Sequence, residues 1–313
     1  MNNVRDEEYI VATYYLETYM DLERAAAALA AEESTGTWVA VGKETGDVKK
    51  RFGAVVLKVN KEYENYSPSL PTRMAPRSGD KVTYSGGKVK IAFPHQNFGS
   101  RIPNLLSTVA GNLYEMGAFT AIKLLDLQFP SGYLREFQGP KFGIRGTRDI
   151  LEVYDRPLLG AIIKPNVGLN TEELAELAYE GAVGGLDFLK DDELMGDPSH
   201  CPLKERVKKI TGALEKAEKQ TGKKTMYAFN ITDRVDRVLE FHDYVVDHGG
   251  NCVMLNYVTS GIGLMRVLSE HTQVPIHAHR DFFSAFTRSP YLGMSSKVFS
   301  KISRMAWADQ LHI

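Results

Sequence analysis

Short apolar runs alternate with longer amphipathic stretches along the chain from Pro157 onward. The runs have the length of buried strands, and the stretches between them place apolar residues at helical spacing. The strands that this pattern predicts cover residues 158–164, 186–190, 225–231, 252–257, 275–279 and 310–313. Repeated strand–helix units predict a parallel sheet, and six of them in series favour a (β/α)8 barrel over an open doubly wound sheet.

Helix-boundary signals fall between these runs. Asn170 with Glu173 predicts an N-terminal capping pair, and Asp233 is expected to cap a helix that reaches about residue 247. Residues 203–220 predict a charged amphipathic helix, which Gly222 is expected to end.

The first part of the chain has a mixed pattern. Strands are expected at residues 9–17, 37–41, 54–59, 88–93 and 120–127, and helices at residues 21–31 and 105–116. Residues 64–80 are rich in Pro, Ser and Arg and predict a long loop. Strands and helices interleaved in this way indicate a small α+β (ferredoxin-like) domain. We therefore expect this domain over residues 1–140 and the barrel over residues 141–313.

The predicted barrel has too few strands to close. A (β/α)8 barrel has eight strands, whereas Ile313 falls within or directly after the sixth strand expected here. We therefore expect an incomplete barrel with about six of the eight strands. We prefer to interpret the sequence as a fragment over a barrel that closes in some unusual way.

The composition is that of a soluble globular protein, with 43% hydrophobic and 25% charged residues. A net charge of -1 argues against a non-specific nucleic-acid-binding protein and against a polybasic protein of membrane surfaces. The N-terminus lacks the features of a signal peptide, and no apolar run is long enough to span a bilayer. Cys201 and Cys252 give no disulfide framework, which indicates a reducing, cytoplasmic compartment.

Polar side chains gather where the predicted strands end, which is the face at which barrel enzymes place their active sites. The residues in such positions are Lys164, Lys190, Asp192, Glu193, Asn230, Asn256, His279, Arg280 and His312. Six successive strands that end in such groups favour a catalytic face over packing alone.

Residues 184–193 (GGLDFLKDDE) carry the most informative of these clusters. Side chains alternate along a strand, so Lys190 and Asp192 point the same way, and Glu193 can turn toward them. Carboxylate oxygens suit Mg²⁺, whereas an ammonium cannot bind a metal unless it becomes an anion, for example a carbamate formed with CO2. The alternative is a solvated strand end with surface acids.

His277 and His279 form a second pair on one face of a strand. A His-x-His pair could bind Zn²⁺. In a strand flanked by apolar residues, one of the two is instead expected to be a hydrogen-bonded core histidine.

Residues 184–193 resemble the metal-site motif of the large chain of ribulose-1,5-bisphosphate carboxylase/oxygenase (rubisco). Further similar segments follow in the same order as in that family: residues 32–38 (EESTGTW), Gly111-Asn112, 160–168 (GAIIKPNVG), 277–280 (HAHR) and 309–312. The resemblance covers nearly the whole chain and includes the archaeal (form III) carboxylases and the rubisco-like proteins.

The resemblance implies roles for individual residues. Lys190 would be carbamylated by CO2 and would hold Mg²⁺ together with Asp192 and Glu193. Lys164 would remove the C3 proton of a sugar bisphosphate, and His279 would assist proton transfer.

It also implies binding residues on both parts of the chain. Arg280 and His312 would bind one phosphate of the sugar bisphosphate. Four further residues would reach into the site of a neighbouring subunit, which implies a homodimer. They are Glu32, Thr37, Trp38 and Asn112.

Several positions depart from the carboxylase pattern. Asn166 stands where carboxylases have a second lysine, Ile162 where many have a threonine, and Phe283 where they have a histidine. The fourth strand reads Leu255-Asn256-Tyr257 in place of His-Asp-Tyr. The Lys-Pro-Asn sequence is more similar to rubisco-like proteins, which enolise or isomerise related sugar phosphates without fixing CO2.

Three hypotheses follow from the resemblance and its departures. The first is Mg²⁺-dependent enolisation of a phosphorylated ketose, leading to carboxylation of ribulose 1,5-bisphosphate to 3-phosphoglycerate. The second is a rubisco-like enolase or isomerase. The third is an inactive fragment or a dimerising remnant of the large chain.

Overall fold

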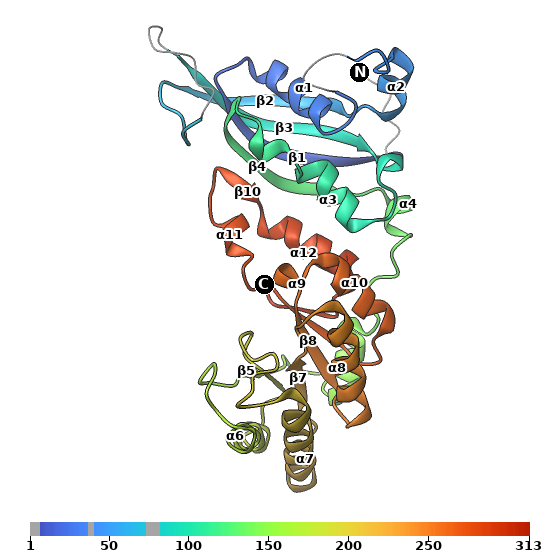
Figure 1. Ribbon diagram of the computed structural model, residues 1–313, viewed down its shortest axis with the longest axis vertical. Helices are drawn as coiled ribbons and strands as arrows, with labels where there is room; N and C mark the ends of the chain where they lie inside the picture. The colour runs from blue at the N-terminus through green and yellow to red at the C-terminus, as the bar shows by residue number, and fades with distance from the viewer. Residues whose placement is uncertain (1–6, 37–40, 73–81) are drawn as a thin grey trace. The chain divides into compact units, whose positions relative to one another are not determined.

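The computed structural model describes residues 7–36, 41–72 and 82–313. The chain divides into two compact units (Figure 1). The first unit is Met1–Phe137 with Phe283–Ile302, and the second is Gln138–Phe282 with Ser303–Ile313. The predicted boundary near residue 140 stays a prediction. Within the described residues, no helix is both long and apolar enough to cross a bilayer.

The first unit is built on a mixed five-stranded sheet of order β10-β4-β1-β3-β2. Four strands are antiparallel neighbours: β1 Tyr9–Thr18, β2 Val55–Asn65, β3 Tyr84–Pro94 and β4 Phe119–Gln128. The unit's helices are α1 Leu22–Glu32, α2 Gly46–Phe52, α3 Ile102–Ala110, α4 Ser131–Leu134 and α11 Ser284–Thr287, with 3-10 turns η1 His95–Asn97 and η2 Leu113–Glu115. The β-α-β-β-α-β succession confirms the predicted ferredoxin-like α+β domain.

Strand β1 shows why this sequence forms a half-buried strand. Its alternate residues Ile10, Ala12, Tyr14 and Leu16 are fully buried, while those between them are partly exposed. This period of two matches the pleat of a strand with one face on the core.

Two expectations for the first unit fail in detail. The helix expected at residues 105–116 ends at Ala110, and Gly111 and Asn112 separate α3 from η2. In addition, no strand was predicted at β10 Leu292–Met294, which pairs in parallel with β4. Three residues are too few to show a period, so only pairing with β4 defines this strand. Residues 37–40 of the strand expected at 37–41 lie outside the described residues.

The second unit is a six-stranded parallel sheet of order β11-β9-β8-β7-β6-β5, which confirms the predicted incomplete (β/α)8 barrel. Its strands are β5 Gly160–Ile162, β6 Phe188–Lys190, β7 Met226–Asn230, β8 Cys252–Asn256, β9 Ile276–His279 and β11 Gln310–Leu311. Each lies within a run that the sequence predicted. The helices are α5 Gly143–Leu151, α6 Thr171–Val183, α7 Leu203–Thr221, α8 Val235–Asp247, α9 Tyr257–Ser260 and α10 Ile262–His271; α12 Ser296–Met305 begins in the first unit and ends in the second.

Alternation along β7 and β8 builds the core inside the half-barrel. Met226 and Ala228 of β7 pack with Cys252 and Met254 of β8 and with Leu151 of α5. The next residue of the same register on each strand is an asparagine, at the strand's carboxyl end. The core pattern therefore carries polar side chains to that end of the sheet.

The helix-capping predictions are partly confirmed. Asn170 and Glu173 form a complete capping box, and Gly222 ends α7 in a left-handed conformation with φ of 70°. The predicted cap by Asp233 is wrong, because Arg234 occupies the N-cap position without a side-chain hydrogen bond. The Asp233 carboxylate instead accepts the amide of Arg234 itself, at 2.6 Å.

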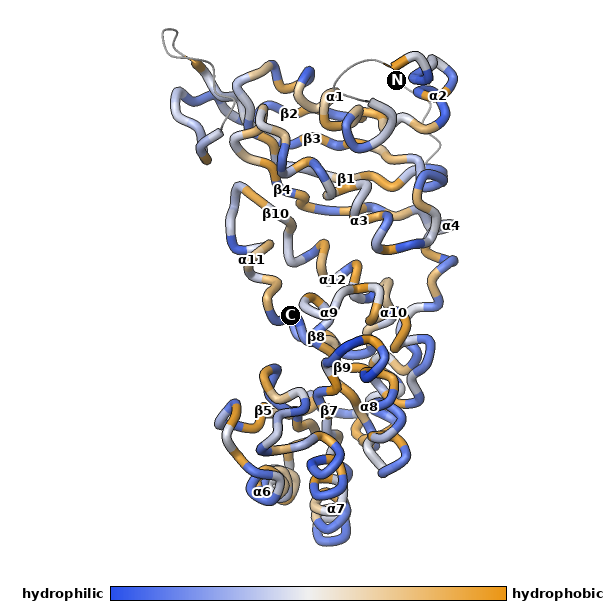
Figure 2. The backbone as a smooth tube through the Cα atoms, viewed as in Figure 1, coloured by the Kyte–Doolittle hydropathy of each residue, from blue (hydrophilic) through white to orange (hydrophobic). Residues whose placement is uncertain are grey.

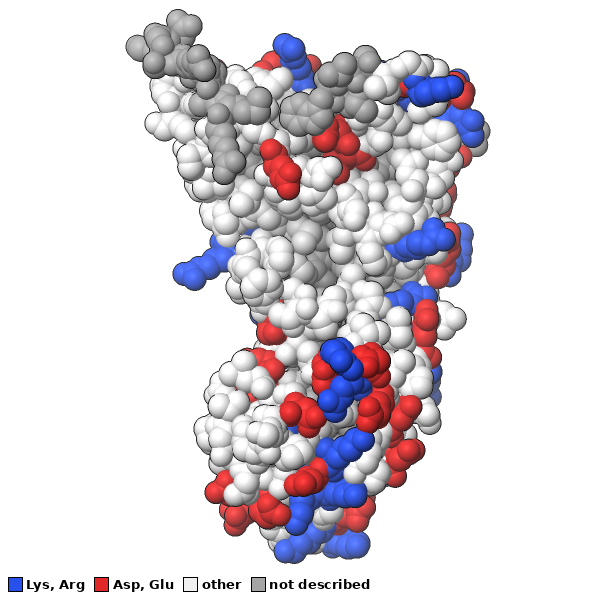
Figure 3. Space-filling model, viewed as in Figure 1, with Lys and Arg blue, Asp and Glu red and all other residues white. Residues whose placement is uncertain are grey.

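Helix α7 is mostly hydrophilic, as its charged amphipathic sequence predicted (Figure 2). Basic and acidic side chains interleave over the part of the surface where α7 and α8 lie (Figure 3). Lys204 of α7 pairs with Glu240 of α8 at 2.6 Å, and both side chains are about half exposed. Such surface pairs contribute little to stability.

Candidate functional site

Strand β6 places neighbouring side chains on opposite faces of the sheet. Phe188 and Lys190 share one face, and Leu189 and Asp191 share the other. Lys190 is 3% exposed, and its Nζ donates to the Asp191 carbonyl at 2.9 Å and lies 3.5 Å from Glu193 Oε2. Burial lowers the pKa of the Lys190 amine, against the opposing pull of Glu193 and Asp192. A lowered pKa favours the neutral amine, which is the form that reacts with CO2.

Asp191 is not part of this cluster, although the sequence placed it among three successive carboxylates. Its side chain is fully buried on the helix side of the sheet, where Oδ2 lies 3.1 Å from the guanidinium of Arg206 on α7. The Tyr227 hydroxyl and the backbone amide of Asn230 also donate to the Asp191 carboxylate, at 2.6 and 2.9 Å. Asp191 therefore anchors the loop that carries Asp192 and Glu193.

Asp192 faces the opposite side and meets the first predicted catalytic residue. Its Oδ2 pairs with Nζ of Lys164, which follows β5, and its Oδ1 accepts the Leu194 amide at 3.0 Å. The Asp192 side chain is 1% exposed and that of Lys164 is 51% exposed. The lysine thus combines a buried anionic partner with access from solvent.

Glu193 connects this cluster to the fifth predicted strand. Its Oε2 lies 3.5 Å from Nε2 of His279 at the end of β9. Burial tends to raise the pKa of Glu193, but its hydrogen bonds and the nearby His279 and Lys190 lower it overall. Burial, together with the Lys190 cation, lowers the pKa of His279 to about 4, so this imidazole is neutral at pH 7.

The remaining predicted barrel residues lie beside His279. The rings of His279 and His312 are 4.8 Å apart. Burial lowers the pKa of His312, with further contributions from Lys190 and Arg280. Arg280 follows β9 directly and is partly exposed. The side chains of His279, Arg280 and His312 thus end the adjacent strands β9 and β11 next to the carboxylate cluster.

His277 behaves as a core histidine. Its ring contacts Phe188 at 5.1 Å between centroids, and its Nδ1 lies 3.2 Å from Gln310 Oε1. Burial lowers its pKa to about 3. Its Nε2 is buried and has no hydrogen-bond partner among the described residues.

Two asparagines hold the metal-site loop, a role that the sequence did not assign to them. Asn230 at the end of β7 donates to the carbonyls of Asp192 and Glu193 at 3.2 and 3.1 Å, and Asn256 at the end of β8 donates to the Glu193 carbonyl at 2.9 Å. Their place at successive strand ends was the available signal. This position identified the two asparagines as polar residues of the site, but it could not show that their side chains hydrogen-bond to backbone carbonyls.

The predicted residues of the N-terminal domain belong to the first unit. Glu32 is the last residue of α1, and Asn112 precedes η2. Burial raises the pKa of the Glu33 carboxyl, and the backbone amides of Leu113 and Asn112 oppose this rise. Thr37 and Trp38 lie outside the described residues.

The donor set of the second unit fits a magnesium ion on one condition. Asp192 and Glu193 supply two carboxylates, and Lys190 supplies a buried amine 3.5 Å from the nearer one. Conversion of that amine to a carbamate would replace a cation by an oxygen anion and complete a hard, all-oxygen set. The residues therefore fit Mg²⁺ with a carbamylated Lys190.

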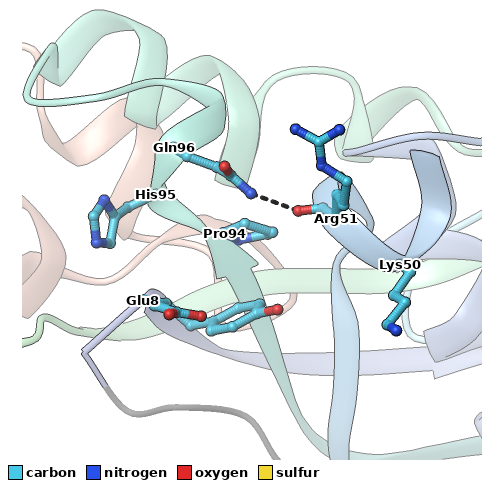
Figure 4. A pocket seen from close by; sticks show the side chains of 7 residues that line it. Glu8, Lys50, Arg51, Pro94, His95 and Gln96 are labelled. Carbon is cyan, nitrogen blue, oxygen red and sulfur yellow. Dashed lines mark hydrogen bonds between the residues drawn. The ribbon is translucent and has the colours of Figure 1, made fainter. Parts of the chain in front are cut away.

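The pocket in Figure 4 lies in the first unit. It has a volume of about 420 Å³, and the Gln96 amide donates across it to the Arg51 carbonyl. Glu8, Lys50 and His95 give its lining both signs of charge. None of the predicted site residues lines it.

Comparison with known proteins matches both units to domains of one protein family. Residues 2–133 match the ribulose bisphosphate carboxylase large chain, N-terminal domain, and residues 143–313 match the catalytic domain of that chain. A ribulose bisphosphate carboxylase-like protein of Allochromatium vinosum is 41% identical over 305 residues, covering 97% of this chain and 66% of the relative.

Two further matches extend this similarity. The 3-oxo-isoapionate-4-phosphate transcarboxylase/hydrolase of Xanthobacter autotrophicus is 40% identical, covering 98% of this chain and 73% of the relative. The crystal structure of a rubisco-like protein from Burkholderia fungorum superimposes with a TM-score of 0.90 at 35% identity, covering 96% of this chain and 72% of the other. The chain spans about two thirds of the length of the curated relatives it matches. The fold of both units, their motifs and these similarities make the chain a member of the ribulose bisphosphate carboxylase (rubisco) large chain family.

Proposed function

We propose that the second unit carries the magnesium and proton-transfer centre of a rubisco-like enzyme. The reaction removes a proton beside the carbonyl of a phosphorylated ketose or keto acid and forms an enediolate, without fixing CO2. The observation that carries the proposal is a cluster at the ends of β5, β6 and β9, in which Lys164 pairs with Asp192 and Glu193 contacts both Lys190 and His279.

Magnesium would be held by Asp192, Glu193 and the carbamate of Lys190. When bound, the ion supplies Lewis-acid stabilisation of the negative charge that enolisation places on oxygen. Lys164 removes the proton from carbon once its amine has left Asp192 and lost its own proton to solvent; the half-exposed side chain can then reach a substrate. His279 moves a proton between substrate oxygens, because burial favours its neutral ring, which can both accept and donate.

Arg280 and His312 bind a phosphate of the substrate in this proposal. A guanidinium suits bidentate contact with phosphate oxygens, and the imidazole of His312 lies close to His279. Glu32, Thr37, Trp38 and Asn112 would complete the site from a neighbouring subunit, which makes a homodimer part of the proposal. The protein would act in the cytoplasm.

Two observations favour the reaction without CO2 fixation. Asn166 follows Lys164-Pro165, where carboxylases have a lysine. The relatives carry the names rubisco-like protein, transcarboxylase/hydrolase and, in Rhizobium etli, 3-oxo-isoapionate-4-phosphate decarboxylase. A phosphorylated 3-oxo sugar acid is therefore the first substrate class to test. Carboxylation of ribulose 1,5-bisphosphate is the second candidate, since Lys190, Asp192 and Glu193 match the metal motif of the carboxylases.

Exchange of the substrate's carbon-bound proton with deuterated water tests the proposal. The chain would be assayed with Mg²⁺ and CO2 on 3-oxo-isoapionate 4-phosphate and on ribulose 1,5-bisphosphate. Lys164→Met should slow exchange by about 10²–10⁴-fold, the usual loss of a general base. Lys190→Ala should abolish the dependence of exchange on Mg²⁺ and CO2.

Lys209→Ala is the matched control, because Lys209 forms only an exposed pair with Glu172. It should exchange at the wild-type rate. Unchanged exchange in Lys164→Met would contradict the assignment of the base. Acid-stable label from ¹⁴CO2 with ribulose 1,5-bisphosphate would favour the carboxylase, and no exchange by the wild-type chain would favour the inactive fragment.

A further inference from the structure

Two helices of the second unit bring together a cluster that the proposed reaction does not use. His242 and Asp243 lie on α8, and His271 is the last residue of α10. Asp243 Oδ1 lies 2.9 Å from His242 Nδ1 and 2.5 Å from His271 Nε2. All three possible ligand atoms fall within 4.8 Å of one another.

We propose that His242, Asp243 and His271 form a binding site for a divalent transition-metal ion, with Zn²⁺ as the reference ion. Two imidazole nitrogens and one carboxylate oxygen are a familiar zinc donor set. The fourth position would be filled by water, because the Asp243 and His271 side chains are 50% and 37% exposed. Bound metal would tie the C-terminal end of α10 to α8.

The hydrogen bonds of His242 orient one ring nitrogen for this role. The hydroxyl of Thr272 donates to the Val274 carbonyl at 2.6 Å and accepts the Val274 backbone amide at 3.2 Å, which leaves one lone pair to accept a further bond. His242 Nε2 lies 3.0 Å from that hydroxyl oxygen, which can accept an Nε2–H when a metal ion holds Nδ1. In this tautomer Nδ1 carries a lone pair that points at the Asp243 carboxylate.

Nδ1 and the Asp243 carboxylate face each other at 2.9 Å, so either a proton on Nδ1 or a metal ion lies between them. A metal ion satisfies both groups, and Thr272 is then the outer partner that fixes the ligand ring. One contact opposes this assignment: the Gln273 amide points at Nε2 from 3.3 Å, which favours the other tautomer.

Nearby groups leave the site open to a cation. Lys141 is the neighbouring positive charge that acts on His242, and its Nζ donates to the Thr272 carbonyl at 2.6 Å. Asp243 supplies the negative charge and contacts both imidazoles. Tetrahedral Zn–N and Zn–O bonds of about 2.0–2.2 Å separate ligand atoms by roughly 3.3–3.6 Å, so Asp243 must move outward from both imidazoles when a metal binds.

Zinc binding by the full chain, measured by equilibrium dialysis in excess Mg²⁺, tests the proposal. The comparison is between wild type and His271→Gln, whose side chain is exposed enough to be changed without disturbing the core. The wild type should bind one more Zn²⁺ per chain than the variant. Any zinc bound at His277, His279 or the carboxylate cluster contributes equally to both and cancels.

Two further variants separate a built site from a surface histidine. Thr272→Val should weaken this Zn²⁺ by about 10–100-fold, the usual effect of losing an outer hydrogen bond to a ligating histidine. His248→Gln on the loop after α8 is the matched control and should bind as wild type, because His248 contacts Tyr244 and lies outside the cluster. Visible absorption of bound Co²⁺ should show a tetrahedral ion in wild type and lose that signal in His271→Gln.

The proposal is overturned if wild type and His271→Gln bind equal zinc. It is also overturned if nitrogen NMR places the His242 proton on Nδ1 with Zn²⁺ present. Neither readout depends on enzymatic activity, so the result is independent of the proposed reaction.

Discussion

Replacing Arg206 by methionine should destabilise the second unit and loosen the loop that carries Asp192 and Glu193. Arg206 and Asp191 are both fully buried and lie 3.1 Å apart. The guanidinium also donates to the carbonyls of Cys201, Gly196 and Met195, at 2.8, 2.7 and 3.1 Å. Methionine keeps the apolar volume and removes all of these bonds, which leaves the Asp191 carboxylate buried without its cation.

The expected loss follows from that uncompensated charge. Removing one partner of a buried ion pair costs about 3–5 kcal/mol. For a folding unit of this size, each kcal/mol lowers the melting temperature by roughly 2–4 °C, so we expect a fall of about 6–20 °C. Thermal and urea unfolding would be followed by the fluorescence of Trp307, which lies in the second unit, in a Trp38→Phe background.

Lys204→Met is the matched control on the same helix. Its pair with Glu240 is about half exposed, so its removal should cost no more than about 1 kcal/mol. A double-mutant cycle with Asp191→Asn should give a coupling energy above about 1 kcal/mol. If Arg206→Met costs no more than the Lys204 control, the reasoning from the buried pair is refuted.

Three further predictions follow from single residues. Burial raises the pKa of Glu33 to about 7, so the stability that this group contributes is full below about pH 4.5 and is lost as the pH rises to about 7. Glu33→Gln should remove about 1–2 kcal/mol of this pH dependence in urea unfolding, which is less than the full pKa shift corresponds to because solvent screens part of the effect. A slope between pH 5 and 7 that is equal in both proteins would contradict this. Gly293→Ala should destabilise β10 by at least about 2 kcal/mol, because φ is 94° and a Cβ would lie 2.0 Å from the Phe286 carbonyl; wild-type hydrogen exchange at Met294 would contradict it. The Asp309 carboxylate accepts hydrogen bonds from the backbone amides of Phe142, Gly143 and Ile276. Asp309→Ala should therefore lower the melting temperature clearly, because each amide that loses its acceptor costs about 1–3 kcal/mol; a fall under 2 °C would count against this.

Patterns that repeat over short distances determined most of the architecture. The six strand–helix units of the half-barrel and the alternation along β1 could be predicted, because burial on one face imposes a period of two or 3.6 on neighbouring residues. The same rule put Lys190 and Asp192 on one face and Asp191, which lies between them, on the other. The capping box of Asn170 and Glu173 is equally local, since its hydrogen bonds span only three residues.

Contacts between distant residues were decided only by the tertiary structure. Strand β10 exists because β4 offers an edge about 170 residues away in sequence, and no periodicity in three residues announces it. Alternation could place Asp191 and Asp192 on opposite faces, but only the fold shows that Arg206 is the partner of Asp191 and Lys164 the partner of Asp192. The hydrogen bonds of Asn230 and Asn256 to the metal-site loop depend in the same way on the order of strands in the sheet. Local periodicity sets which face a side chain takes, while the chemistry it performs depends on partners that only the folded chain supplies.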